Sequence, residues 1–427
     1  MLYQFLRPIV RIVAKFFFKK IYIHNMHLIP QDKPVIIASN HPSAFLEPVL
    51  MAVILPKPVF SMVKGSVFTK PLYIKLLKAL KMIPIFRIQE GYANLKNNQA
   101  TFDVTHDLLK QNQQILIFVE GTTIHHKHLK PLQKGAARIA FSAIEKYGTD
   151  FDMQIVPCGV NYTNQKAYRD TVMMEYGAPI RVLDFWQTYC DNNNRGIVAL
   201  TNEMENRIKP LVVHIEHTED EEVTEQLLIM QRNTVPQTVF PIQDSSNIIL
   251  RYERRTAKAI CDMDNDTKNN LKIQSHTYLK ALKEANIKDF GVAQPKFGNG
   301  VNSFIVWLGF VPFLIGYVMS YLYIKSGKLV ADKYSPEIEY YASIWLGVTS
   351  FAAIVYFLIW IIIGCVFNSI TLWGFIVLMP ILGFYSLQYY EFREKWRLAK
   401  TANKNTSPAQ LVDLQEQRLA LLNAVEI

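Results

Sequence analysis

The last third of the chain contains long apolar runs without any charged residue. One run extends from Val301 to Ile324 and another from Tyr340 to Tyr390. A helix that crosses a membrane needs roughly 20 apolar residues, so residues 300–390 are predicted to form a membrane region of about three spans. We place the spans near Val301–Ile324, Tyr341–Phe367 and Ile370–Tyr389. Buried core helices of a large soluble protein are the alternative, although core helices rarely run so long without a charge.

The amino-terminal segment, residues 1–27, mixes apolar and basic positions. Cations recur at four-residue spacing at Arg7, Arg11, Lys15 and Lys19, so a helix over residues 2–23 would carry them on one face. This pattern predicts a basic amphipathic helix at the membrane interface, lying on anionic lipid. A secretory signal peptide is not expected, because an unbroken apolar run with a small-residue cleavage site is missing.

Between residues 28 and 183, short apolar runs alternate with longer helical patterns. This order predicts an α/β domain whose mixed sheet is covered by helices on both sides. The predicted strands are Val35–Ser39, Val59–Val63, Met82–Phe86, Ile115–Val119, Ile155–Val160 and Val172–Tyr176. The segment 184–299 is polar and mostly helical, with no assignable chemistry, and residues 391–427 are predicted to form a basic helical tail.

The charge balance of the chain is basic, with 46 Lys and Arg against 36 Asp and Glu. Such a surface suits anionic phosphate, which can belong to nucleic acid or to lipid headgroups. The basic residues lie beside the apolar spans and form no RNA-reading motif, so we expect membrane lipid as a partner and no nucleic acid. The four cysteines are scattered without paired spacing, so the chain need not be oxidised.

A histidine follows the first strand of the predicted domain. Pro42 suits the first position of a helix, so His41 would stand at the strand-to-helix turn, exposed at the carboxyl edge of the sheet. Glu47 is near enough to accept a hydrogen bond from the imidazole, hold its tautomer and stabilise the imidazolium. The pair could deprotonate an alcohol. Taken alone, such a pair is more often a structural hydrogen bond or a helix cap.

Polar residues also follow the other predicted strands. Lys64 comes after the second strand, Arg87 ends the third, and Glu120, Gly121 and Thr122 follow the fourth. Each stands just past an apolar run, so these residues are expected to gather at one edge of one sheet.

From about Pro34 to Ile180, the order and spacing of these blocks resemble the superfamily of glycerol-phosphate and lysophospholipid acyltransferases. The resemblance implies that His41 is the general base and Glu47 its orienting acid. It further implies that Lys64 and Arg87 bind the acceptor phosphate. In the same way Glu120, Gly121 and Thr122 would shape the acceptor pocket. Lys134 lies in Leu132–Arg138, which resembles the segment after the third block, and is taken as a further substrate-binding residue.

The sequence departs from the family pattern at three points. The acid is Glu at the sixth position after His41, where Asp at the fifth is usual. Val119 stands where Pro is common, and Thr123 stands where an Arg often contacts phosphate. Another cation must then bind the phosphate, and Lys127, Lys130 and Lys134 are nearest in sequence.

The resemblance implies transfer of a fatty acyl group from acyl-CoA or acyl carrier protein to a hydroxyl of glycerol 3-phosphate or lysophosphatidate, without cofactor or metal. Because the acyl donors are cytosolic thioesters, the catalytic domain is expected on the cytoplasmic face of the membrane. Three spans would put the basic tail on the opposite side, so one run is expected to be re-entrant or interfacial.

Three further readings stay open. The histidines of the polar loop, His125, His126 and His128, could bind a metal with His214 and His217, but adjacent histidines in a solvated loop do not imply the tetrahedral geometry of a zinc site. The altered acid and the missing Arg also favour a non-catalytic membrane protein that binds lipid through an acyltransferase-like domain. An acyltransferase that acts on another lysolipid is a third candidate.

Overall fold

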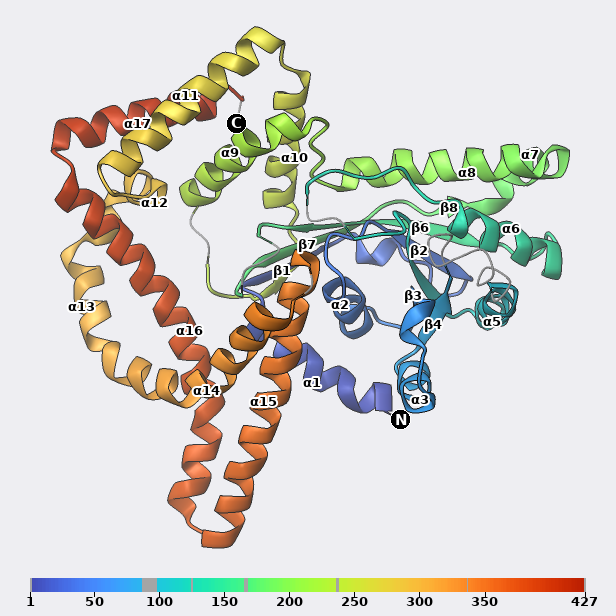
Figure 1. Cartoon of the computed structure of the whole chain (residues 1–427), viewed down its shortest axis with the longest axis horizontal. Helices are drawn as coiled ribbons and strands as arrows, with labels where there is room; N and C mark the ends of the chain where they lie inside the picture. The colour runs from blue at the N-terminus through green and yellow to red at the C-terminus, as the bar shows by residue number, and fades with distance from the viewer. Residues whose placement is uncertain are drawn as a thin grey trace. The chain divides into compact units, whose positions relative to one another are not determined.

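The computed structural model describes residues 2–86, 98–123, 126–164, 168–235, 238–335 and 337–425 (Figure 1). The chain forms two compact units. Unit 1 comprises residues 1–214, 242–250 and 336–343, and unit 2 comprises residues 215–241, 251–335 and 344–427. Two short segments of the carboxyl-terminal half therefore belong to unit 1.

Unit 1 is built around a mixed sheet, as the apolar runs predicted. The strand order is β4-β3-β5-β2-β6-β7-β1-β9, with β8 paired to β6. The neighbouring pairs are parallel except β6 with β7 and β6 with β8. The strands are β1 (Lys20–His24), β2 (Val35–Ser39), β3 (Val59–Lys64), β4 (Met82–Ile85), β5 (Gln114–Phe118), β6 (Gln154–Tyr162), β7 (Thr171–Tyr176), β8 (Ile180–Arg181) and β9 (Gln243–Asp244). All six predicted strands are present, with ends that differ by one or two residues at most.

Helices cover this sheet. Those of unit 1 are α1 (Leu2–Phe17), α2 (Leu46–Ile54), α3 (Pro71–Ala79), α5 (Asn98–Lys110), α6 (Gly135–Tyr147), α7 (Trp186–Asp191) and α8 (Asn193–Ile208). One face of the sheet packs against α5, α6 and α8, in a core that includes Ile36, Ile115, Phe141 and Leu200. Strand β2 is buried along its whole length, which is typical of a strand with parallel neighbours and covered faces.

The amino-terminal helix is shorter than predicted, and two of its basic residues bind another helix. Helix α1 ends at Phe17. Residues 20–24 form β1 instead, and β1 pairs in parallel with β7. Lys19 therefore lies outside the helix. Arg7 donates to the carbonyls of Leu55 and Pro56, and Arg11 donates to that of Val53, at the carboxyl end of α2. These two arginines cap a helix whose last carbonyls lack partners, and the contact of residues 1–27 with membrane lipid stays a prediction.

Unit 2 is helical. It contains α9 (Glu221–Thr234), most of α10 (Ile248–Asp262), α11 (Asn265–Glu284), α12 (Asp289–Ala293), α13 (Gly300–Leu308), α14 (Phe310–Tyr334), most of α15 (Ile338–Phe367), α16 (Ile370–Asn405) and α17 (Pro408–Asn423). Its core includes Leu227, Tyr278 and Leu421. A buried ion pair joins Asp289 to Arg418, with 2.9 Å between Oδ1 and Nε.

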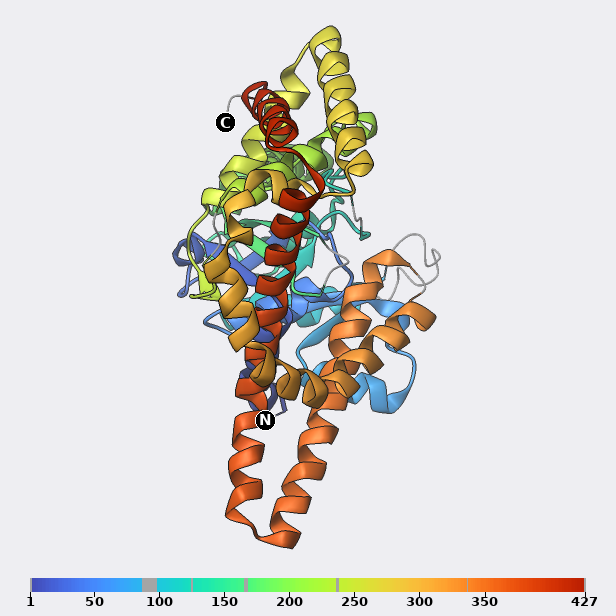
Figure 2. The ribbon, with the colours of Figure 1, turned by 90° about the vertical axis from the view of Figure 1, so that its left-hand side faces the viewer.

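Two helices, α15 and α16, are long and apolar enough to cross a membrane, with mean hydropathies of 2.5 and 1.9. They are joined at Asn368 and Ser369, and Figure 2 shows them running in opposite directions from that turn. The first predicted span is not one straight helix, because α13 and α14 meet at Gly309 with a bend of 51°. Such a bend belongs to a broken span or a re-entrant segment, which agrees with the expectation that one apolar run is irregular.

Candidate active site

The predicted site residues follow neighbouring parallel strands at one sheet edge. In the ladder between β2 and β5, Ser39 is opposite Phe118, so His41 and Glu120 each stand two residues past a paired position. Lys64 ends β3, which lies beside β5, and its side chain is exposed. Arg87 lies outside the described residues. The strand pairing places His41, Glu120 and Lys64 at a common edge, as their positions after the strands predicted, and the place of Arg87 stays a prediction.

His41 and Glu47 lie close together. Nδ1 of His41 is 3.3 Å from Oε2 of Glu47, and Oε1 of Glu47 accepts a hydrogen bond from the backbone N–H of Ser43 at 2.7 Å. Glu47 lies in the first turn of α2 and is fully buried. The amino end of a helix favours a carboxylate, so the backbone helps to hold Glu47 beside the imidazole.

The turn that carries His41 differs from the prediction in two ways. Helix α2 begins at Leu46, so Pro42 is not its first residue. The amides of Ser43 and Ala44 instead bind Glu47 and the carbonyl of Glu339. The imidazole is also less accessible than predicted, because only 7% of His41 is exposed. The ring of Phe118 stacks on the imidazole, with 3.9 Å between ring centroids and 14° between the planes.

Glu120 binds two backbone segments at once. Its Oε2 accepts from the N–H of His41 at 2.6 Å, and its Oε1 accepts from the N–H of Lys130 at 2.9 Å. Burial raises the pKa of Glu120, although these two hydrogen bonds oppose the effect. The carboxylate therefore fixes the turn that carries His41 against the loop after β5.

The residues after Glu120 shape that loop. Gly121 has a φ of 71°, and a Cβ there would lie 2.8 Å from the side chain of Gln133, so both backbone and space favour glycine. Nζ of Lys130 donates to Oγ1 of Thr122 at 3.2 Å. Lys134 precedes α6 and is exposed. Of the three cations considered as replacements for the missing Arg, Lys130 is the one bonded to Thr122.

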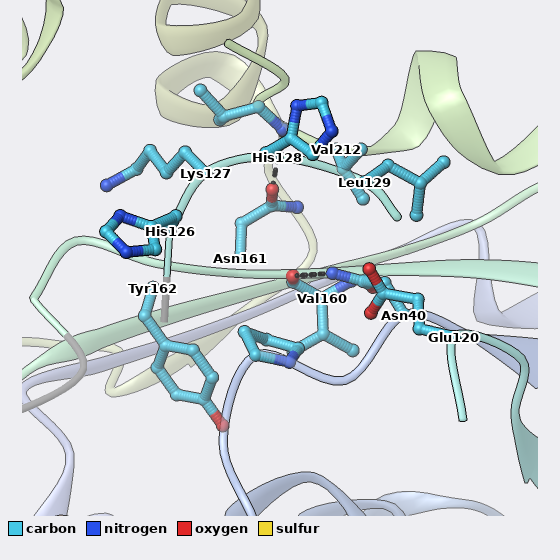
Figure 3. A pocket seen from close by; sticks show the side chains of 12 residues that line it. Asn40, Glu120, His126, Lys127, His128, Leu129, Val160, Asn161, Tyr162 and Val212 are labelled. Carbon is cyan, nitrogen blue, oxygen red and sulfur yellow. Dashed lines mark hydrogen bonds between the residues drawn. The ribbon is translucent and has the colours of Figure 1, made fainter. Parts of the chain in front are cut away.

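A pocket of about 370 Å³, including its open mouth, lies at this edge (Figure 3). Its lining includes Asn40 and Pro42, on either side of His41, together with Glu120, His126 and Lys127. The side chain of Asn40 binds the backbone of Val160 in both directions, at 2.9 and 2.7 Å. The pocket thus places the carboxylate of Glu120 and the cation of Lys127 beside the turn that carries His41.

Tyr162 was not singled out from the sequence. It ends β6, lines the pocket and is almost fully buried. Burial raises the pKa of Tyr162 well above its ordinary value, and the nearby carboxylate of Glu47 raises it further. Tyr162 reaches the pocket because β6 pairs with β2. The spacing of the sequence motifs does not predict which strands pair, so it could not identify this residue.

One of the loop histidines, His128, lies near His214. The ring centroids of His128 and His214 are 4.8 Å apart, and Nδ1 of His214 accepts from the N–H of Leu129 at 3.0 Å. His125 lies outside the described residues. Within the part of the chain that the structure describes, no group of three or more His, Cys, Asp or Glu could hold a metal ion.

Comparison with known families gives a match for about the first third of the chain. Residues 20–161 match the family model described as Acyltransferase. This stretch begins at β1, ends in β6 and includes His41, Glu47, Lys64 and Glu120. This part of the chain is therefore similar to acyltransferase domains, which is consistent with the glycerol-3-phosphate and lysophospholipid acyltransferase superfamily that the sequence resembles.

Curated relatives point in the same direction. The chain is 32% identical over 91 residues to Glycerol-3-phosphate O-acyltransferase 1 of Saccharomyces cerevisiae, and 25% identical over 208 residues to Glycerol-3-phosphate O-acyltransferase 2. These segments are 21% and 48% of this chain but only 12% and 27% of the relatives. The similarity therefore covers one part of these relatives and not their whole length.

A crystal structure of the 1-acyl-sn-glycerophosphate (LPA) acyltransferase PlsC from Thermotoga maritima is also similar. The sequence identity is 14% and the TM-score 0.34, and the match covers 49% of this chain and 80% of that chain.

Proposed function

We propose that this protein is a membrane O-acyltransferase of glycerolipid synthesis. It transfers a fatty acyl group from a thioester, acyl-CoA or acyl carrier protein, to a hydroxyl of glycerol 3-phosphate or lysophosphatidate. The observation that carries the proposal is the 3.3 Å approach of His41 Nδ1 to Glu47 at the carboxyl edge of an acyltransferase domain. A carboxylate in this position holds the imidazole with its other nitrogen, Nε2, ready to accept a proton.

In the proposed reaction, Nε2 of His41 removes the proton of the acceptor hydroxyl. The hydroxyl oxygen attacks the thioester carbonyl, and the tetrahedral intermediate then collapses with cleavage of the carbon–sulfur bond. The departing thiolate takes the proton back from the imidazolium, so atoms and charges balance. The ionised Glu47 stabilises the imidazolium during this cycle, and no enzyme nucleophile is required.

Cations at the sheet edge would bind the acceptor phosphate. Lys64 and Arg87 keep this role as proposals, and Lys130 takes the place of the missing Arg after Thr122. Lys127 lines the pocket, and Lys134 is exposed before α6. Lysine binds phosphate as a point charge without the paired geometry of Arg, so this site would tolerate small differences in the acceptor. The catalytic domain would face the cytoplasm, where the acyl thioesters are.

One observation favours the second candidate, a non-catalytic lipid-binding protein. His41 is 7% exposed, so an acceptor reaches its imidazole only if neighbouring groups give way. A measurement of acyl transfer distinguishes the acyltransferase from the lipid-binding protein.

The test is thiol release by the full chain in detergent, with acyl-CoA or acyl carrier protein and a panel of glycerol phosphate and lysolipid acceptors. We expect acceptor-dependent release, and His41→Ala should lower it about 100-fold to 10,000-fold. His106→Ala is the matched control, because His106 is equally buried and bonds Ser142 on α6, away from the sheet edge. Near-normal turnover by His41→Ala refutes the proposed base, and no release with any acceptor supports the lipid-binding protein.

A further inference from the structure

A short segment from the carboxyl-terminal half of the chain belongs to unit 1. Residues 336–343 are part of this unit, although the residues on both sides of them belong to unit 2. The segment includes the first turn of α15, which begins at Ile338. Ala342 is 1% exposed, so the start of α15 is closely packed.

The turn between His41 and Glu47 binds this segment through hydrogen bonds. The carbonyl of Glu339 accepts from the N–H of Ala44 at 3.2 Å and from Oγ of Ser43 at 3.3 Å. The N–H of Ser43 donates to Oε1 of Glu47 at 2.7 Å, and Ser43 is buried. Ser43 therefore links the carboxylate of Glu47 to the carbonyl of Glu339.

An aromatic contact lies next to these hydrogen bonds in the sequence. The ring centroids of Phe45 and Tyr340 are 6.1 Å apart, with 56° between the planes. Aromatic pairs attract each other at this separation. Three consecutive residues of the turn, 43–45, thus contact two consecutive residues of the segment, 339 and 340.

Regular secondary structure does not fix this turn. Strand β2 ends at Ser39 and α2 begins at Leu46, so residues 40–45 belong to neither element. The hydrogen bond from the His41 N–H to Glu120 holds the beginning of the turn, and α2 holds Glu47 at its end. The middle of the turn is bound by the start of α15.

We propose that Tyr340 and the backbone of Glu339 position the His41–Glu47 pair, so that the first turn of α15 is part of the active site. They hold residues 43–45 in the conformation that leaves His41 Nδ1 3.3 Å from Glu47 Oε2. Tyr340 is a positioning residue, because it acts through the turn. The role rests on the proposed acyltransferase function. A displacement of about 1 Å can lower turnover about 100-fold, so a small shift of the turn is expected to matter.

The experiment removes the aromatic contact from each side in the full chain. Tyr340→Ala, Phe45→Ala and the double variant are compared with Tyr340→Phe, which keeps the ring. Tyr73→Ala is the matched control, because Tyr73 is a half-exposed tyrosine of unit 1 on α3, a helix without buried residues. Steady-state kinetics give kcat and KM. Peptide mass spectrometry gives the rate at which diethyl pyrocarbonate modifies His41, with the buried His106 as internal reference.

We expect Tyr340→Ala and Phe45→Ala each to lower kcat about 10-fold to 100-fold with a smaller change in KM. The double variant should lose no more than either single variant, because both remove the same contact. Tyr340→Phe should keep kcat near that of the wild type. In Tyr340→Ala, His41 should be modified several-fold faster and His106 at the wild-type rate.

Three results overturn the proposal. One is a kcat of Tyr340→Ala equal to that of Tyr73→Ala. Another is a higher kcat, because the segment would then restrain the turn. The third is equal acceleration of modification at His41 and His106, which would mean that the whole unit is loosened.

The modification rate does not depend on turnover, so the two proposals can fail separately. If the wild type transfers no acyl group, the proposed function fails. Faster modification of His41 in Tyr340→Ala would then still show that the start of α15 holds the turn, and an unchanged rate would overturn that contact as well.

Discussion

Glu120 holds the backbone of His41 through a hydrogen bond of 2.6 Å from the His41 N–H to Oε2. The other carboxylate oxygen accepts from the N–H of Lys130 at 2.9 Å. The group that the family pattern associates with the acceptor pocket thus also fixes the base relative to the loop after β5. This arrangement makes Glu120 a positioning residue whose loss should affect the geometry of the base more than the affinity for substrate.

We expect Glu120→Ala to lower kcat strongly with a smaller change in KM. The substitution leaves two backbone N–H groups near the buried turn without an acceptor, at a cost of about 1–3 kcal/mol each. Glu120→Gln retains one acceptor oxygen and should recover part of the turnover. Steady-state kinetics of both variants test this, with Glu145→Gln on α6 as control. Wild-type kcat in Glu120→Ala would contradict the positioning role.

The raised pKa of Glu120 has a consequence for stability. A carboxyl whose folded-state pKa lies above the ordinary 4.5 contributes stability that is fully present below the unfolded pKa. That contribution is lost as the pH rises through the folded pKa. The midpoint of thermal unfolding of the wild type, minus that of Glu120→Gln, should therefore fall as the pH rises from about 4.5. A difference that stays constant or grows with pH would show that the pKa is not raised.

The sequence predicted the sheet better than the surroundings of the base. Apolar runs of strand length define β2, β3 and β5, and parallel pairing then places Lys64, His41 and Glu120 at one edge. The predictions that failed depend on tertiary contacts. Strand β1 is stabilised by its hydrogen bonds to β7. The four-residue spacing of basic residues continues through Lys19 and predicted a helix there.

The burial of His41 has the same kind of cause. Phe118 stacks on the imidazole, and the carbonyl of Glu339 binds the adjacent turn from almost 300 positions along the chain. The sequence pattern around His41 predicts neither of these contacts. Tyr162 was missed for the same reason, since its place beside Glu47 depends on β6 lying next to β2.

Tyr162→Phe tests that missed residue. Its buried phenol lies close enough to Glu47 for the carboxylate to raise the tyrosine pKa, so the hydroxyl is expected to help orient Glu47. A hydrogen bond to a charged group contributes about 1.5–3 kcal/mol, which corresponds to a roughly 10-fold to 150-fold loss of kcat. The pH profile of kcat/KM should shift as well, because Glu47 acts through His41. Tyr176→Phe, on β7 and equally buried, is the control and should leave the profile unchanged.

The last prediction concerns unit 2, where Asp289 accepts hydrogen bonds from Tyr278 at 2.7 Å and from Arg418 at 2.9 Å. Arg418 lies on α17 and also donates to Thr234 of α9, so the network joins α17 to the rest of the unit. Asp289→Ala leaves the buried guanidinium without its counter-charge, and the free energy of unfolding should fall by about 3–5 kcal/mol. Urea denaturation in detergent, together with protease sensitivity at α17, measures the effect.

The control is an exposed ion pair of the same unit. Glu394 and Arg397 are three residues apart on α16, with 2.7 Å between Oε2 and Nη2, and Glu394→Ala should cost about 1 kcal/mol or less. Asp289→Ala combined with Arg418→Met removes both buried charges and should recover much of the loss, because an apolar pair of similar volume needs no counter-charge. Equal effects of Asp289→Ala and Glu394→Ala would mean that the Asp289–Arg418 pair does not hold α17 in place.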